Sequence, residues 1–285
     1  MTKNMEKVAH KYIVCLVKVS QLQIKESAKM LCVKRFDFVL IVLFGLLDLD
    51  HGKQFPAPIK RCRMDDEACL VQQGEMFFKT FKHGIPELGV DSIDPLDLGT
   101  LTIDSGEQSA SLQFKLVLTN AKLYNLGSST SVKSLKGFIK DPKKNLKLTL
   151  VIYAPELELH AQYDVNGKVL ILPIVSKGNV IIRLKKMTGK SRIIAEPQKR
   201  DDGKTYLNII DYKTVSKMEG GHFNMSNLFN DNVELRESTL KVLNDEWEAL
   251  AMDIQPRINE ACDRVLKKAL QRFWNDIPYD EFFEN

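Results

Sequence analysis

The central part of the chain alternates apolar and polar residues with a period of two. Between Ser109 and Tyr212, segments such as SLQFKLVLT, LKLTLVIY and PELELHAQY place every second residue on one apolar face. Such alternation is typical of strands with one buried face. The segments are separated by residue pairs that favour turns, which are Asp141-Pro142, Asn166-Gly167, Gly178-Asn179, Gly189-Lys190 and Asp202-Gly203,. Strands joined by tight turns are antiparallel, so the pattern predicts a long antiparallel meander.

The C-terminal part has a different period. From Leu240 to Phe273, apolar residues recur every three or four positions, which places them on one stripe of a helix,. Pro256 lies within this stripe and is expected to bend the helix, because the stripe continues in phase on both sides. A helix this long needs a partner that covers its length, and the sheet is the only predicted element large enough. The two patterns therefore predict an α+β fold in which a highly curved antiparallel sheet wraps around a long C-terminal helix.

Residues 38–47 form an uncharged apolar run, FVLIVLFGLL, that follows Lys34 and Arg35. The run is about half of the ~20 residues needed to cross a bilayer, so we expect no stable membrane insertion. Its length and basic flank are typical of a secretion signal, with Met30 as the working start. We therefore expect an upstream extension without function at 1–29, a signal peptide at 30–52, and a single secreted, extracellular domain at 53–285. A core strand remains an alternative for the apolar run, because a short run does not distinguish the two.

The net charge of +4 would suit a nucleic-acid partner, but much of it lies near the N-terminus. Residues 1–52 carry eight Lys/Arg and five Asp/Glu, which leaves a net charge of +1 on the remaining residues. The lysine-rich stretch from Lys133 to Lys147 is the one basic candidate, and charged runs of this kind are usually solvated faces. We expect no nucleic-acid partner, since phosphate binding needs a concentrated basic face.

The sequence lacks the motifs that commonly mark an enzyme, such as Gly-x-Ser-x-Gly, Gly-x-Gly-x-x-Gly and His-Glu-x-x-His,. The five histidines are scattered along the chain, and no group of residues has metal-ligand spacing,. We therefore predict no catalytic residue, no cofactor and no metal site.

Three cysteines follow the predicted signal peptide: Cys62, Cys69 and Cys262. The close pair in CRMDDEAC can form a disulfide in an oxidising compartment. A metal site is the rival interpretation, but it needs about four ligands and the chain offers no second pair at suitable spacing. Cys262 lies in the predicted helix and is expected to be an unpaired thiol that packs as a small apolar residue.

Three segments together resemble a known family. In pattern and separation, CRMDDEAC, GIPELGVDSIDPL and NLFNDNVELRESTLKVLNDEW are similar to the secreted takeout and juvenile-hormone-binding proteins of insects. The similarity runs from Lys60 to Phe283, which is nearly the whole predicted mature chain. It implies a tubular lipid-binding fold with an elongated apolar tunnel that carries a hydrophobic ligand. Hormone-binding members typically have a second disulfide whose cysteines this chain lacks, which favours the takeout branch.

Together these features predict a monomeric, non-enzymatic carrier of a small hydrophobic ligand, such as an isoprenoid, a juvenile-hormone-like or a fatty-acid-like molecule. Two alternatives remain open: an extracellular protein-interaction module with a filled core, and a secreted lipid hydrolase whose triad is assembled from distant residues. Asn224 in NMS is a candidate glycosylation acceptor,. Tyr124, Tyr153 and Tyr163 are candidate polar anchors for a ligand.

The apolar positions of the strands and the helix are the candidates for lining the tunnel. The same pattern would also serve a packed core, and the sequence does not separate the two roles. The residues predicted to line the tunnel are Phe114, Leu116, Leu118, Leu148, Leu150, Leu157, Leu159, Leu172, Leu207, Ile209, Trp247, Leu250, Ile254 and Ile258.

Overall fold

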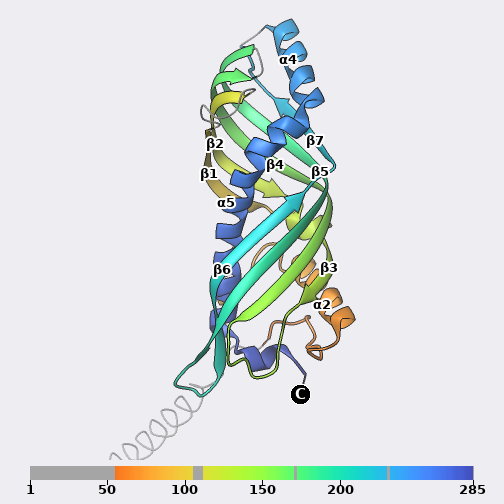
Figure 1. The fold of residues 1–285 in the computed structure, drawn as a ribbon, viewed down its shortest axis with the longest axis vertical. Coiled ribbons are helices and arrows are strands. Elements are labelled where there is room, and N and C mark those ends of the chain that lie inside the picture. Colours follow the sequence, from red (N-terminus) through yellow and green to blue (C-terminus); the bar gives the residue numbers. More distant parts are fainter. Residues whose placement is uncertain (1–54, 105–111, 170–171, 230–231, 285) are drawn as a thin grey trace, which may run out of the picture. The chain divides into compact units, whose positions relative to one another are not determined.

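The computed structural model describes residues 55–104, 112–169, 172–229 and 232–284. The chain divides into two units, residues 1–52 and residues 53–285, and all the described residues belong to the second. The predicted upstream extension and signal peptide lie outside the described residues and stay predictions. In the second unit, a curled antiparallel sheet lies against a long helix, α5 (Figure 1).

The described helices and strands follow one another with short connections. Their bounds in chain order are α2 Glu67–Thr80, the short 3-10 helix η1 Pro86–Leu88, β1 Leu96–Asp104, β2 Leu112–Tyr124, α3 Leu126–Ser129, β3 Ser131–Lys136, β4 Leu146–Val169, β5 Leu172–Lys199, β6 Thr205–Lys217, β7 Gly220–Met225, α4 Val233–Asp245, α5 Trp247–Asp276 and η2 Tyr279–Phe282.

The sheet has the strand order β1-β2-β4-β5-β6, with β3 paired to β4 and β7 paired to β5. All of these pairings are antiparallel. The two ends of the strand order, β1 and β6, both contact α5, so the sheet curls around the helix. The predicted fold class is therefore confirmed. The predicted turns at Asp141-Pro142 and Asp202-Gly203 are also confirmed, since they lie between β3 and β4 and between β5 and β6.

The other three predicted turns are wrong. Asn166-Gly167 lies inside β4, and both Gly178-Asn179 and Gly189-Lys190 lie inside β5. The alternating segments therefore join into strands of 24 and 28 residues. Gly178 serves close packing rather than a turn, because a Cβ there would lie 2.3 Å from the carbonyl oxygen of Ser226.

The two longest strands change phase together. In β4 the buried positions Ala154 and Leu157 are three residues apart, and in β5 the buried positions Leu184 and Met187 are also three apart. Ala154 pairs with Met187 and Leu157 with Leu184, so both strands shift at the same place in the register. Most of the apolar side chains of both strands consequently stay on the inner face, with Val151 and Val175 among the exceptions.

The inner face packs into two hydrophobic clusters. The first contains β1, β2 and the N-terminal half of α5, and includes Leu118, Leu159 and Ile254. The second contains α2, the C-terminal end of α5 and the facing parts of β4 and β5, and includes Leu148 and Phe273.

The predicted C-terminal helix is two helices. The chain breaks helical geometry at Glu246, which has φ −100° and ψ 24° and separates α4 from α5. The expectation of one uninterrupted helix from Leu240 is therefore wrong, whereas Pro256 does lie inside α5. Directly after the break, Trp247 packs so closely on Gly221 of β7 that a Cβ on the glycine would lie 2.9 Å from the indole. The break thus places the Trp247 indole over the Gly221 position of β7, where a larger residue would not fit.

Polar residues of α5 bond the outer edge of β6 and form what we call the α5–β6 seam. The amide N–H of Thr214 donates to Asp263 Oδ2 at 3.0 Å, and that of Ile209 donates to Gln271 Oε1 at 2.6 Å. Lys267 Nζ and Gln271 Nε2 donate in turn to backbone carbonyl oxygens of β6. These bonds satisfy polar groups that an edge strand otherwise leaves unpaired. The seam residues on α5 recur at every fourth position: Gln255, Asn259, Asp263, Lys267 and Gln271.

A disulfide joins Cys62 to Cys69, as the sequence predicted. Cys69 lies in the first turn of α2, where its N–H donates to the capping side chain of Asp66 at 3.0 Å. Cys62 forms a parallel bridge with Phe283, and its carbonyl oxygen accepts from the N–H of Glu284 at 3.0 Å. The disulfide therefore ties the start of α2 to the C-terminal segment.

Removing this disulfide is expected to destabilise the protein moderately. The bond spans a sequence separation of 7, and the loss of loop-closure entropy corresponds to about 2.5 kcal/mol in the double variant Cys62→Ala/Cys69→Ala,. For a unit of this size, we expect thermal unfolding to shift down by about 5–10 °C. The control is Cys262→Ala, which removes a half-buried free thiol. A melting temperature of the double variant equal to that of this control would contradict the prediction.

Candidate ligand-binding site

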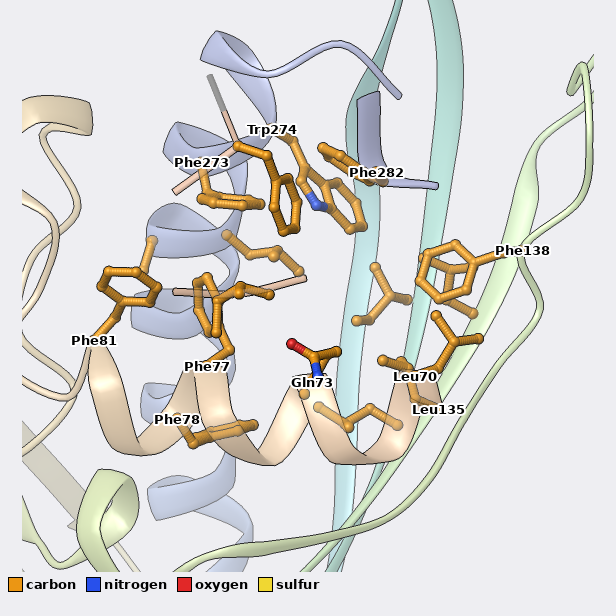
Figure 2. Close-up of a pocket in the computed structure, with 18 of the residues that line it drawn as sticks. Leu70, Gln73, Phe77, Phe78, Phe81, Leu135, Phe138, Phe273, Trp274 and Phe282 are labelled. Atoms are coloured by element: carbon orange, nitrogen blue, oxygen red, sulfur yellow. The ribbon is translucent and has the colours of Figure 1, made fainter. Parts of the chain in front are cut away.

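An apolar cavity of about 240 Å³ lies within the second cluster. It is enclosed by α2, the C-terminal half of α5, the inner faces of β4 and β5, and segments near both ends of the described chain. Figure 2 shows the aromatic side chains of α2 and α5 gathered on one side, with Leu135 of β3 and Phe138 of the following loop on the other. Its lining residues are Phe55, Ile59, Lys60, Cys62, Leu70, Gln73, Gly74, Phe77, Phe78, Phe81, Val90, Ile93, Leu135, Phe138, Leu148, Leu150, Ile193, Tyr212, Leu266, Ala269, Leu270, Phe273, Trp274, Phe282 and Phe283.

Aromatic rings form much of the cavity wall. Phe77 of α2 meets Phe273 of α5 edge to face, with ring centroids 5.2 Å apart. Phe273 also meets Phe55 at 6.1 Å and Phe282 at 5.9 Å. Edge-on contacts of this kind contribute beyond the area they bury, and they hold the rings in fixed positions. The wall is therefore preformed by packing among its own side chains.

Small residues leave the space that the rings surround. Gly74 on α2 and Ala269 on α5 both line the cavity. Further toward the N-terminus, the buried stripe of α5 carries Leu250, Ile254 and Ile258, which fill the first cluster. The small residues at these two positions leave room for the cavity between α2 and the C-terminal end of α5.

Two uncharged polar side chains, Gln73 and Tyr212, interrupt the apolar wall. Gln73 Oε1 accepts a hydrogen bond from the N–H of Lys60 at 2.7 Å, which fixes the amide and leaves its NH₂ group as a donor,. Burial raises the pKa of Tyr212 to about 12, so the phenol stays protonated at physiological pH,. The cavity thus combines a large apolar surface with hydrogen-bond donors at a few fixed points.

A second, smaller cavity of about 50 Å³ lies in the first cluster. It is lined by residues of β2, β4, β5, β7, α4 and α5, and among the described residues that line it Tyr163 is the only polar one. The Tyr163 hydroxyl donates to the carbonyl oxygen of Ser226 at 2.8 Å. A space with so few polar partners holds a water molecule poorly, and such apolar spaces stay dry.

The residues predicted to line a tunnel fall into four groups. Leu148 and Leu150 line the larger cavity. Trp247 is half-buried against the first cluster, and Leu172 begins β5, where its side chain lies outside what the structure describes. Five others line the smaller cavity: Phe114, Leu116, Leu118, Leu250 and Ile254. The remaining five are buried in the two clusters away from both cavities: Leu157, Leu159, Ile258, Leu207 and Ile209.

Sequence reasoning missed the α2 and C-terminal walls of the larger cavity. Phe77 and Phe78 lie near the end of α2 and Phe81 directly follows it, and Phe273 and Trp274 are adjacent near the end of α5. This local density of aromatic residues at the two ends of the domain was a signal that could have located the cavity.

The predicted polar anchors lie elsewhere. Tyr124 stacks against His160, with centroids 4.6 Å apart, and Tyr153 lies under Lys133 Nζ at 5.5 Å. Tyr163 lines only the smaller cavity. Tyr212, which the sequence did not single out, is the tyrosine of the larger cavity.

Within the described ranges, the clearest contact between a serine and an acid lacks the intervening histidine of a hydrolase triad. Ser128 Oγ donates directly to the carboxylate of Asp94 at 2.7 Å, whereas a triad places a histidine between the two,. The Asp94 carboxylate also accepts from the N–H groups of Asn125 and Ser128, so it organises the start of α3. Burial raises the pKa of the Cys262 thiol to about 12, which keeps it protonated and a poor nucleophile,.

Two searches of the described residues bear on other functions. No group of three or more His, Cys, Asp or Glu side chains among them could hold a metal ion. None of the helices formed by the described residues is long and apolar enough to cross a membrane.

The curled sheet, the enclosing helix and the apolar cavity define the takeout-like class of tubular lipid-binding folds. The crystal structure of Takeout 1 from Epiphyas postvittana has this fold, with a TM-score of 0.71 and 25% identity over 80% of this chain and 100% of that chain. The family model described as haemolymph juvenile hormone binding protein matches residues 38–284. The chain therefore belongs to the takeout and juvenile-hormone-binding family, whose members are generally carriers of hydrophobic ligands.

Two relatives are considerably more similar in sequence. The circadian clock-controlled protein daywake of Drosophila yakuba and that of Drosophila melanogaster are each 57% identical to this chain over 251 residues. Each alignment covers 86% of this chain and 96% of the relative.

Proposed function

We propose that this protein is a secreted carrier that holds one small hydrophobic molecule in the larger cavity. The observation that carries the proposal is the aromatic-walled space of about 240 Å³ between α2, α5 and the sheet. A cavity slightly below the roughly 300–1,000 Å³ of typical small-molecule sites suits a compact ligand. The ligand classes that fit are a small isoprenoid, a juvenile-hormone-like molecule and a fatty-acid-like chain.

The chemistry of the wall supports a ligand with one polar end. Burying ~400 Å² of apolar ligand surface contributes about 10 kcal/mol before association costs, which leaves roughly micromolar affinity after those costs. Gln73 supplies a hydrogen-bond donor that orients a ligand oxygen, and Tyr212, whose hydroxyl also bonds Ser191 and Thr214, lines the same cavity,. We therefore propose a ligand whose apolar body fills the aromatic end and whose carbonyl, ester or hydroxyl oxygen faces these two side chains.

Secretion, glycosylation and a monomeric state complete the proposal. The disulfide suits an oxidising compartment,. Asn224 is exposed on β7, as a glycosylation acceptor needs to be,. We propose that the mature protein begins after the signal peptide at 30–52, carries a glycan at Asn224 and acts as a single chain.

Mass spectrometry of the protein purified from its source tests this proposal. Under native conditions we expect the mass of one chain plus one apolar molecule with an oxygen at one end, and solvent extraction identifies that molecule. Under denaturing conditions we expect the mass of a chain without its first 52 residues and with a glycan. A folded protein without ligand would support an interaction module instead, and turnover of an ester lipid that one point substitution abolishes would support a hydrolase.

A further inference from the structure

The outer face of the sheet carries its charges in two different ways. On the half that covers the first cluster, opposite charges are paired. Glu158 accepts from both Arg183 and His160 at 2.8 Å, and Lys177 contacts Asp164 at 2.7 Å. These ion pairs neutralise part of the charge on this half.

The half that lies outside the larger cavity is basic. Arg192 of β5 pairs directly with Lys213 of β6, and Lys217 follows four positions further along β6. Asp211 bonds Arg192 at 2.8 Å and Glu67 bonds Lys136 at 3.1 Å, whereas no described acid forms an ion pair with the other four cations. We call this surface the basic face, and its exposed members are Lys136, Lys147, Lys190, Arg192, Lys213 and Lys217.

This arrangement does not serve the stability of the sheet. Like charges directly opposite each other on neighbouring strands are destabilising, and Arg192 and Lys213 are such a pair,. The paired charges of the other half show that the same sheet accommodates compensating acids. A concentration of cations, four of which have no ion-pair partner among the described acids, is typical of a binding surface,.

Apolar side chains lie among the cations of the basic face. Val215, which is 70% exposed, pairs with Lys190 across the β5–β6 ladder. Val151 of β4 pairs with Lys190 from the other side and is half-buried. Long cationic side chains around exposed aliphatic groups are typical of surfaces that meet the headgroup region of a bilayer.

The basic face and the cavity wall lie on opposite sides of the same strands. On β4, the exposed Lys147 lies between Leu146 and Leu148, and Leu148 lines the cavity. On β6, Tyr212 lines the cavity and the next residue, Lys213, is exposed. A partner held on the basic face is therefore separated from the cavity by one layer of sheet.

We propose that the basic face docks this protein on anionic phospholipid surfaces. Membrane binding itself does not depend on the proposed carrier function. Its purpose does, since docking would bring the cavity to a membrane that supplies or accepts the ligand. The cations spread over β3, β4, β5 and β6, which suits the diffuse field of many headgroups better than a site for one phosphate,. The stretch from Lys133 to Lys147 supplies only two of the six cations, so the sequence alone did not reveal the surface.

Vesicle flotation with the full chain expressed in insect cells tests this inference. We expect the protein to float with phosphatidylcholine vesicles that contain phosphatidylserine and not with phosphatidylcholine alone, and to be released by salt. Lys190→Gln/Lys213→Gln should weaken the partition by about 30-fold, because each lysine near an anionic surface contributes a factor of about five. The matched control is Lys115→Gln/Lys122→Gln, which removes two exposed lysines of β2 outside the basic face.

Several outcomes would overturn the inference. They are equal partition onto both kinds of vesicle, an equal loss in the control, or displacement of the protein by soluble phosphoserine, which would indicate a single headgroup site. Ligand content is measured on the same samples. Lost vesicle binding in a protein that retains its ligand counts against the basic face alone, whereas an empty cavity in a protein that floats counts against the carrier alone.

Discussion

Leu150→Trp is expected to lower ligand occupancy by about 15-fold while the protein stays folded. Leu150 is a half-buried residue of β4 that lines the larger cavity. An indole at this position occupies space that the ligand would fill, and displacing two buried methylene groups of the ligand costs about 1.6 kcal/mol. The cavity accepts the added volume, so the strain that overpacking causes in a filled core is largely avoided. Extraction of the purified variant followed by mass spectrometry measures the occupancy.

The neighbouring residue supplies a matched control for this variant. Val151 follows Leu150 on the same strand and pairs with Lys190 on the outer face, so Val151→Trp adds the same side chain outside the cavity. We expect Val151→Trp to retain wild-type ligand occupancy. Equal occupancy in Leu150→Trp and Val151→Trp, with both proteins folded, would show that the ligand is bound elsewhere.

Phe273→Ala is expected to lower the free energy of unfolding by about 3–5 kcal/mol, which corresponds to a decrease of about 6–20 °C in melting temperature. Phe273 is buried, and its ring meets those of Phe55, Phe77 and Phe282. The substitution removes all three ring contacts and enlarges the space beside them. Thermal unfolding followed by circular dichroism measures the effect.

Phe138→Ala is the corresponding control. Phe138 also lines the cavity, but it is half-buried and its described ring contact is with Phe283, at 5.1 Å. We expect this variant to lose clearly less stability than Phe273→Ala, because a half-exposed ring loses less buried area. If the two variants melt at the same temperature, the aromatic contacts of Phe273 do not stabilise the cavity wall as described.

Periodicity predicted the types of element well because burial on one face is a local property. The alternation around Leu116 and Leu148 and the stripe around Ile254 are both found as a strand face and a helix face directed inward. Turn positions were less predictable. Gly178 and Gly189 look like turn residues in the sequence, but their small size serves close contacts with Ser226 and Ile152, which only the folded chain brings near.

The position of the cavity could not be read from the strands. Leu148 and Leu150 line the cavity, whereas Leu157 and Leu159 are core, although all four alternate in the same way. The difference comes from what faces them, since α2 covers one end of the sheet and the large residues of α5 fill the other. A helix that docks from a distant part of the sequence leaves no mark in the local pattern of β4.

The α5–β6 seam also bears on how such a protein stays soluble at high concentration. An edge strand with free N–H and carbonyl groups can pair with the edge of another molecule, and a chain built from strands of 24 and 28 residues is exposed to that hazard,. The side chains at every fourth position of α5 occupy these groups on β6 before a neighbouring molecule can reach them. The helix that encloses the apolar interior is thus also a built-in guard against amyloid-like assembly.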